Sequence, residues 1–132
     1  ILHPQDALQA KQLGLAGVVV SNHGGRALEG SPASLAVLPQ VRAAVGDDFM
    51  LLLDGGIRRG SDVFKALALG AQAVLLGRPQ AYGLGAAGAL GVAQMLRLLR
   101  EELELTMALA GCATLADISS ACLVNPNEFS SC

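Results

Sequence analysis

Short apolar runs alternate along the chain with longer segments in which apolar residues recur at helical spacing. The runs cover residues 16–20, 49–53 and 73–76, and each is followed by a polar residue or by glycine. They are too short for helices and are apolar throughout, which predicts strands buried on both faces.

The segments between these runs predict helices. Residues 5–13 are compatible with a helix that ends at Gly14. Ser61 is a good N-cap for a helix over residues 62–69, and Gly70 is its natural stop.

Two more helices follow from apolar residues at helical period. Pro39 is expected at or near the first turn of one of them, which carries Leu35, Leu38, Val41 and Val45. The other has an apolar stripe, interpreted as core packing, opposite a charged face. The stripe is Val92, Met95, Leu96, Leu99, Leu103 and Met107, and the charged face is Arg97, Arg100, Glu101 and Glu104.

The resulting order, αβαβαβα, indicates a parallel sheet covered by helices. Two architectures fit this order, a doubly wound sheet and part of a (β/α)₈ barrel. A doubly wound sheet of the Rossmann type would carry Gly-x-Gly-x-x-Gly at its first turn, and this sequence has no such motif there. Three βα units are too few for a whole barrel of about 250 residues. The sequence therefore predicts an α/β fold, the C-terminal portion of a (β/α)₈ barrel: about three βα units and a C-terminal helix over residues 1–118. Residues 119–132, with the turn signal Asn125-Pro126-Asn127, are predicted to be a polar, frayed tail.

Composition narrows the function classes. Hydrophobic residues make up 52% and charged residues 15%, which argues against disorder. Aromatic residues are only 3% and the net charge is −2, so a nucleic-acid partner is not expected. No apolar run approaches the roughly 20 residues of a membrane span.

Cysteine usage and the chain ends bear on location. Cys112, Cys122 and Cys132 are an odd set without metal-ligand spacing, which argues against a disulfide framework or a metal site and favours a reducing compartment. The start shows no signal-peptide pattern, and residues 130–132 differ from the peroxisomal address Ser-Lys-Leu. The cytoplasm is therefore the expected location, with the peroxisome as the alternative if the protein is eukaryotic.

The first group of candidate chemical residues follows the first predicted strand, in residues 21–26 (Ser-Asn-His-Gly-Gly-Arg). Histidine is the residue type best suited to act as a general base at neutral pH, which makes His23 a candidate, and Arg26 offers a planar fork that matches a carboxylate. The competing interpretation is a glycine turn with a surface histidine and arginine. The position at a strand's carboxyl end favours a site.

The second group follows the next two strands, in residues 54–60 (Asp-Gly-Gly-Ile-Arg-Arg-Gly) and at Gly77-Arg78. Glycine amides and arginines at adjacent strand ends are typical of a phosphate site. Solvated arginines on tight turns are the alternative, which we adopt for Arg59 but not for Arg58 or Arg78.

These motifs, with residues 65–71 (Lys-Ala-Leu-Ala-Leu-Gly-Ala) and 77–79 (Gly-Arg-Pro), resemble the FMN-dependent α-hydroxy-acid dehydrogenase family. That family includes glycolate oxidase, L-lactate oxidases and dehydrogenases, and mandelate dehydrogenase. The resemblance extends to about Ile118 and matches the family's last three barrel strands and C-terminal helix. It implies that His23 is the active-site base, that Arg26 binds the substrate carboxylate and that Ser21 contacts the flavin ring. It also implies FMN binding by Asp54, Gly55, Gly56, Ile57, Arg58, Gly77 and Arg78.

The resemblance implies that the full-length parent oxidises a small L-2-hydroxy acid, such as lactate or glycolate, to a 2-oxo acid. It also implies that the parent is a homo-oligomer, namely a tetramer. Residues 27–29 (Ala-Leu-Glu) depart from the usual Gln-Leu-Asp. The strands on which the family carries a flavin-contacting Lys, substrate-contacting tyrosines, a second Arg and the Asp partner of the base are not in these residues. The alternatives are a partial, non-catalytic chain, or another FMN- or phosphate-binding barrel such as a flavin-type isopentenyl-diphosphate isomerase.

Overall fold

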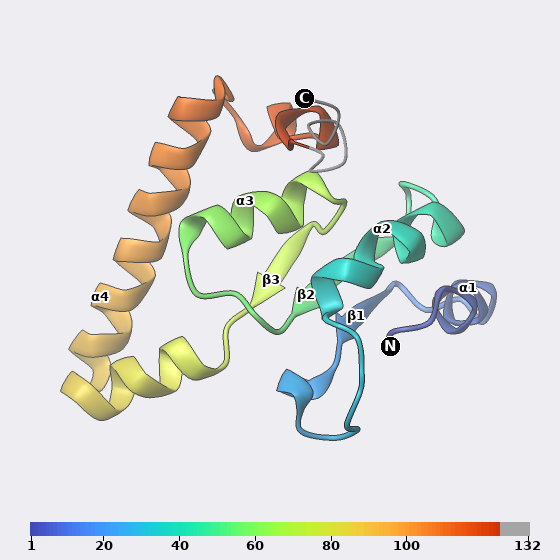
Figure 1. Ribbon diagram of the computed structural model, residues 1–132, viewed down its shortest axis with the longest axis horizontal. Coiled ribbons are helices and arrows are strands. Elements are labelled where there is room, and N and C mark those ends of the chain that lie inside the picture. The colour runs from blue at the N-terminus through green and yellow to red at the C-terminus, as the bar shows by residue number, and fades with distance from the viewer. Residues whose placement is uncertain (125–132) are drawn as a thin grey trace, which may run out of the picture.

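A computed structural model describes residues 1–124 of the 132-residue chain. Helices and strands alternate along it in the predicted order (Figure 1). The helices are α1 (Pro4–Gln12), α2 (Ser34–Val45), α3 (Gly60–Ala68) and α4 (Arg78–Ala110); the strands are β1 (Gly17–Ser21), β2 (Met50–Asp54) and β3 (Ala73–Leu75); the short 3₁₀ helices are η1 (His23–Gly25), η2 (Leu115–Asp117) and η3 (Ser120–Cys122).

The three strands form one parallel sheet in the order β1-β2-β3. In its register Ser21 lies opposite Asp54, and Asp54 lies opposite Leu75. The outer edge of β1 is contacted by Ile1, whose amino group donates to Val19 and whose carbonyl accepts from Ser21, both at 3.2 Å. The parallel register brings the carboxyl ends of all three strands to the same end of the sheet, where the polar loops begin.

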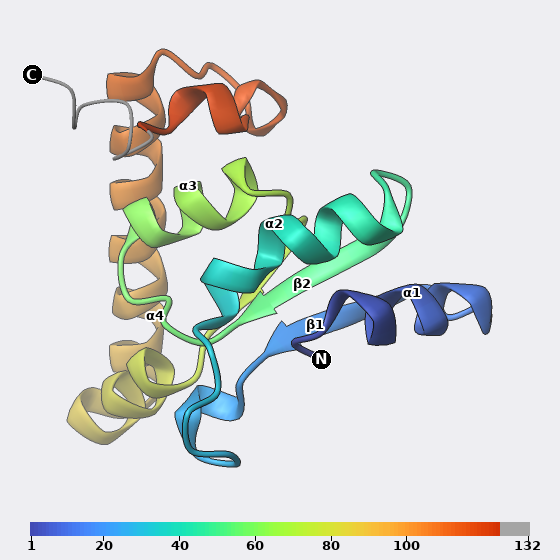
Figure 2. The same ribbon diagram turned by 45° about the vertical axis from the view of Figure 1, so that its right-hand side comes forward.

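The two faces of the sheet have different surroundings. Val18, Val20, Leu51 and Leu53 are buried in a core with side chains of α1 and α2, and Figure 2 shows α2 and α3 crossing this side of the sheet. Side chains alternate in direction along a strand. The opposite face therefore carries Ser21 and Asp54, together with Met50 and Leu75, which are 50% and 39% exposed.

Helix α4 consists of two helical parts joined at Ala87 and Gly88, whose φ angles are −152° and 59°. A Cβ on Gly91 would overlap the carbonyl of Gly83, so these two glycines let the parts approach closely. The second part crosses α3 and contacts it (Figure 1). Only this second part was predicted from the apolar period, and its first part begins at Gly77-Arg78, where the sequence indicated a loop.

The prediction for Pro39 is wrong. Helix α2 begins at Ser34, so Pro39 lies inside it and not in its first turn. The early start has a tertiary cause: the buried Ser34 hydroxyl accepts a hydrogen bond from the backbone N–H of Asn22 at 3.1 Å. This contact fixes the backbone at Ser34, on the N-terminal side of Pro39.

Ser61 is not the N-cap of α3, contrary to the prediction. The helix begins at Gly60, and the Asp62 carboxylate accepts the backbone N–H groups of Arg58 and Arg59, both at 3.0 Å. An N-cap Ser61 would accept the backbone N–H of residue 63 or 64, but the N–H of Val63 donates to the Arg59 carbonyl at 3.3 Å. The carboxylate in the first turn instead satisfies the N–H groups just before the helix.

The apolar stripe of α4 packs only in part. Leu99, Leu103 and Met107 contact the two buried clusters, whereas Leu96 is 48% exposed and no residue of α4 is fully buried. The charged face is as predicted, since it carries ion pairs of 2.7 Å between Arg97 and Glu101 and between Arg100 and Glu104.

Helical structure continues past residue 118. Helix η3 follows at Ser120–Cys122, and Leu123 packs on a small cluster that includes Phe64 and Ile118. The rest of the predicted tail, with its Asn125-Pro126-Asn127 turn, lies outside the described residues.

Candidate functional site

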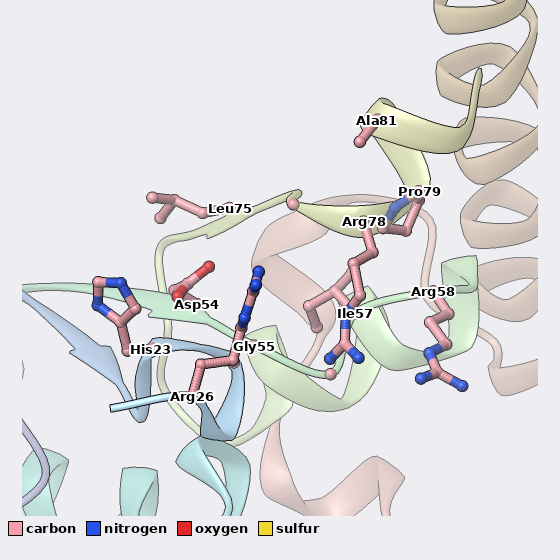
Figure 3. Close-up of a pocket in the computed structure, with 13 residues that line it drawn as sticks. His23, Arg26, Asp54, Gly55, Ile57, Arg58, Leu75, Arg78, Pro79 and Ala81 are labelled. Atoms are coloured by element: carbon pink, nitrogen blue, oxygen red, sulfur yellow. The ribbon is translucent and has the colours of Figure 1, made fainter. Parts of the chain in front are cut away.

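A cavity of about 430 Å³ opens at the carboxyl ends of the three strands. Figure 3 shows His23, Arg26 and Asp54 toward one end of it and Arg58 and Arg78 toward the other. The lining residues come from the last residues of β2 and β3, the segments that follow β1, β2 and β3, and the start of α4: His23, Gly24, Arg26, Asp54, Gly55, Gly56, Ile57, Arg58, Leu75, Gly77, Arg78, Pro79 and Ala81.

At the first end, a chain of hydrogen bonds joins the loop after β1 to the end of β2. The Ser21 hydroxyl donates to Oδ2 of Asp54 at 2.6 Å and accepts the backbone N–H of His23 at 2.9 Å. His23 adopts a positive φ of 58°, which is unusual for a residue with a Cβ. The imidazole and the Arg26 guanidinium are exposed beside the cavity.

The shape of this loop depends on Asn22, which the sequence analysis did not single out. Its side-chain oxygen accepts the N–H of Gly25, and its amide nitrogen donates to the carbonyl of Pro32, both at 3.2 Å. Asparagine directly after a strand and before two glycines is a turn signal that could have indicated this role.

At the second end, Gly55 and Gly56 have φ angles of 102° and 82° and form the cavity wall without a Cβ. Arg58 and Arg78 line the same cavity from the start of α3 and of α4. Arg59 is exposed and is not among the lining residues, in agreement with its interpretation as a solvated arginine.

A second cavity of about 340 Å³ adjoins the first on the side of α2 and α3. The two share lining residues on the Gly55-Gly56 turn, together with Arg78. The space around this turn is therefore larger than the first cavity alone.

The structure brings together nearly all of the predicted site residues. Nine of them line one cavity: His23, Arg26, Asp54, Gly55, Gly56, Ile57, Arg58, Gly77 and Arg78. Ile57 also belongs to the main core and is only 5% exposed. Ser21 is not among the lining residues and instead hydrogen-bonds to Asp54. The sequence did not single out Leu75 or Ala81, because small and apolar residues carry no chemical signal of their own. Gly24 and Pro79 belong to the motifs at residues 21–26 and 77–79.

The charge of the cavity favours an anion. Arg26, Arg58 and Arg78 line it, against the single carboxylate of Asp54, which already accepts the Ser21 hydroxyl. Guanidinium groups bind carboxylates and phosphates through paired hydrogen bonds. These guanidinium groups lie toward two different ends of the cavity. The cavity therefore suits either one ligand with two anionic groups or two ligands with one anionic group each.

A family model for FMN-dependent dehydrogenases matches residues 1–125. The chain is 62% identical over 119 residues to an L-lactate oxidase of Alicycliphilus denitrificans, a match that covers 90% of this chain and 33% of the relative. It is 54% identical over 128 residues to a peroxisomal (S)-2-hydroxyacid oxidase of Arabidopsis thaliana, covering 97% of this chain and 35% of the relative.

Among solved structures, a mandelate oxidase variant with a monooxide FMN adduct superposes with a TM-score of 0.85 at 51% identity. The match covers 88% of this chain and 37% of that one. The predicted fold class, the C-terminal portion of a (β/α)₈ barrel, is confirmed. The chain spans about a third of the length of the relatives it matches. Within residues 1–124, no helix is long and apolar enough to cross a membrane.

Proposed function

Because the chain belongs to the family of FMN-dependent dehydrogenases, we propose that the full-length protein oxidises a small L-2-hydroxy acid to the 2-oxo acid with FMN as cofactor. The observation that carries this proposal is the convergence of His23 and Arg26 with Arg58 and Arg78 on one cavity. The names of the relatives, an L-lactate oxidase and an (S)-2-hydroxyacid oxidase, support the substrate class.

The residues at the second end of the cavity fit FMN. The positions where Gly56 and Gly77 would carry a Cβ have no neighbour within 4 Å, so a ligand can approach the backbone there. Arg58 and Arg78 supply positive charge for the phosphate there, and Asp54, toward the first end, offers an acceptor for ribityl hydroxyls. In this proposal Ser21 acts at the flavin ring, next to the carboxylate that it contacts.

The residues at the first end suit the substrate. Arg26 pairs with the substrate carboxylate and so fixes the orientation of the substrate's C2 atom. His23 takes a proton from the substrate. Loss of two protons and two electrons converts the hydroxy acid into the oxo acid, and FMN supplies the acceptor for the electron pair.

The cofactor assignment is tested by flavin binding to the full-length protein. Arg58→Gln removes a guanidinium from the cavity, and Arg59→Gln removes its exposed neighbour as a matched control. A charge-assisted hydrogen bond contributes about 1.5–3 kcal/mol, so Arg58→Gln is expected to weaken FMN binding by roughly 10–150-fold. Quenching of FMN fluorescence measures the affinity. Equal affinities in the two variants would contradict the assignment.

The reaction is tested separately by mixing the FMN-loaded full-length protein with L-lactate, glycolate or D-lactate without oxygen. We expect the L-acid or glycolate to bleach the flavin absorbance and D-lactate to leave it unchanged. Bound flavin that no 2-hydroxy acid bleaches would favour the alternative of another FMN-binding barrel. Homo-oligomeric assembly and a cytoplasmic location remain proposals, which light scattering and cell fractionation test.

A further inference from the structure

Two cysteines meet at a place that the proposed function does not use. A small buried cluster of Phe64, Ala68, Cys112 and Ile118 joins α3 to the segment after α4, and Cys122 packs against it. Figure 1 shows this segment turning back from the end of α4 over α3, at the other end of α3 from the cavity loops. None of the residues that line the cavity belongs to this cluster.

The two sulfur atoms are in contact. Sγ of Cys112 lies 3.7 Å from Sγ of Cys122, and both cysteines are free thiols. Each thiol also lies 3.8 Å from the carbonyl oxygen of Asp117, which both can use as an acceptor. A disulfide needs sulfurs about 2 Å apart, so closure would join two sulfurs that are already in van der Waals contact.

The loop between the two cysteines is held in this shape by its own hydrogen bonds. The Asp117 carboxylate accepts the backbone N–H of Thr114 at 2.6 Å and its hydroxyl at 3.0 Å. Gly111, with a φ of 75°, ends α4 and allows the N–H of Cys112 to bond the carbonyl of Met107. The thiols therefore meet without a change in backbone conformation.

The two thiols differ in reactivity. Cys112 is buried, and burial raises the pKa of its thiol. Cys122 is partly exposed, and a backbone hydrogen bond from Ser119, together with the contact to Cys112, lowers the pKa of its thiol. Because the thiolate is the nucleophile, Cys122 is the cysteine that reacts first and Cys112 is the one that resolves the product.

We propose that Cys112 and Cys122 form a redox modification site that reacts with hydrogen peroxide and closes to an intramolecular disulfide. The Cys122 thiolate attacks the peroxide, the O–O bond breaks, and Cys122 becomes a sulfenic acid with release of hydroxide. The Cys112 thiol then attacks the Cys122 sulfur, the S–O bond breaks, and a proton neutralises the hydroxide. In total, two thiols and one hydrogen peroxide give one disulfide and two waters.

The closed disulfide would tie η3 to the end of α4 across α3 and leave the strand-end cavity unchanged. The proposal therefore does not depend on the proposed function. Its test needs neither flavin nor turnover, so failure of one proposal leaves the other standing.

The experiment treats the protein with hydrogen peroxide, alkylates the remaining thiols and maps the cysteines by mass spectrometry. The sequence has no Lys or Arg after Arg100, so trypsin would leave all three cysteines in one peptide. Cleavage before Asp117 and after Glu128 separates them into three peptides. We expect the Cys112 and Cys122 peptides to become linked, two hydrogens lighter than their sum, and to separate again with dithiothreitol.

Two variants sharpen the result. Cys122→Ser is expected to abolish the cross-link and leave Cys112 available for alkylation after denaturation, with an unchanged circular dichroism spectrum. Cys132→Ser is the matched control and is expected to retain the Cys112–Cys122 link. A sulfinic acid at Cys122 beside a free Cys112 thiol, or a disulfide that includes Cys132, would overturn the proposal.

Discussion

His23 is, within residues 1–124, the one residue other than glycine with a positive φ. Such a conformation costs roughly 1–3 kcal/mol and persists only where the surroundings enforce it. Here the Ser21 hydroxyl accepts the His23 N–H, and Asn22 closes the turn by accepting the N–H of Gly25. The backbone thus holds the imidazole beside the cavity, and the energetic cost of doing so marks the position as a functional candidate.

Substitution of His23 tests its role as the base. In the full-length protein, His23→Ala is expected to lower turnover by about 10²–10⁴-fold, the usual contribution of a general base. FMN should stay bound, because Arg58 and Arg78 lie toward the other end of the cavity. The matched control is His3→Ala, which removes an exposed histidine that caps α1. Steady-state kinetics and the flavin spectrum measure the two effects; near-normal turnover of His23→Ala would exclude the assignment.

Arg26→Lys keeps the positive charge but removes the planar fork that grips both oxygens of a carboxylate. Loss of one charge-assisted bond costs about 1.5–3 kcal/mol, so kcat/KM for the hydroxy acid should fall by roughly 10–150-fold. FMN affinity should be unchanged. If kcat/KM is also unchanged, Arg26 is only a loop residue.

At this scale the sequence predicted which chemical groups gather, because parallel strands bring their carboxyl ends to one edge. It did not predict that Asp62 would accept the N–H groups of Arg58 and Arg59, or that the Ser21 hydroxyl would bond Asp54. Both contacts depend on side-chain positions that strand and helix boundaries alone leave undetermined.

Among the elements, the crossing of α3 and α4 depends on a glycine. Gly60 is buried at the start of α3, its N–H donates to Oε2 of Glu102 at 2.9 Å, and a Cβ there would overlap the backbone of Glu102 and Leu103. Helix α4 can approach α3 this closely only because the side chain is absent.

Gly60→Ala is therefore expected to lower the free energy of unfolding of the full-length protein by about 1–3 kcal/mol, the usual cost of overpacking. Gly85→Ala is the matched control: it lies in the first part of α4, and its added Cβ would meet nothing within 4 Å. Alanine there should raise the unfolding free energy by roughly 0.5–1 kcal/mol. Urea denaturation measures both, and equal effects would exclude this account of the crossing.

Element types were predictable and element starts were not. Each apolar run became a strand because its length and composition fit only a buried strand. The first part of α4 was missed because its glycines, such as Gly83 and Gly85, are typical of a loop. The start of α2 was missed because the Ser34–Asn22 contact is tertiary. Local patterns contain no information about such contacts.

At the scale of the molecule, one face of the sheet lacks cover from the residues that the structure describes, 1–124. Val18, Val20, Leu51 and Leu53 point away from this face and pack on the helices. The apolar surface instead lies on the uncovered face, at Met50 and Leu75, and along α4, where Leu90 and Leu109 are 80% and 82% exposed. A surface of this kind favours association.

The 132-residue chain expressed alone is thus expected to associate and not to oxidise lactate or glycolate. Beyond the two hydrogen bonds with Ile1, the outer edge of β1 presents backbone groups that can pair with another chain. Size-exclusion chromatography with light scattering measures the state, and the full-length protein is the control. A monomer that carries stoichiometric FMN and oxidises lactate would contradict this expectation.

The joint at Gly88 has a consequence for how this sequence can vary. Its φ of 59° and ψ of −141° lie in a region that only glycine occupies readily, yet nothing lies within 4 Å of the position where a Cβ would be. A library of single substitutions in the full-length protein should therefore reject nearly every residue at position 88 while accepting most at Gly85. Intolerance at a site without neighbours would come from backbone conformation alone, and a survey of side-chain contacts would not detect it.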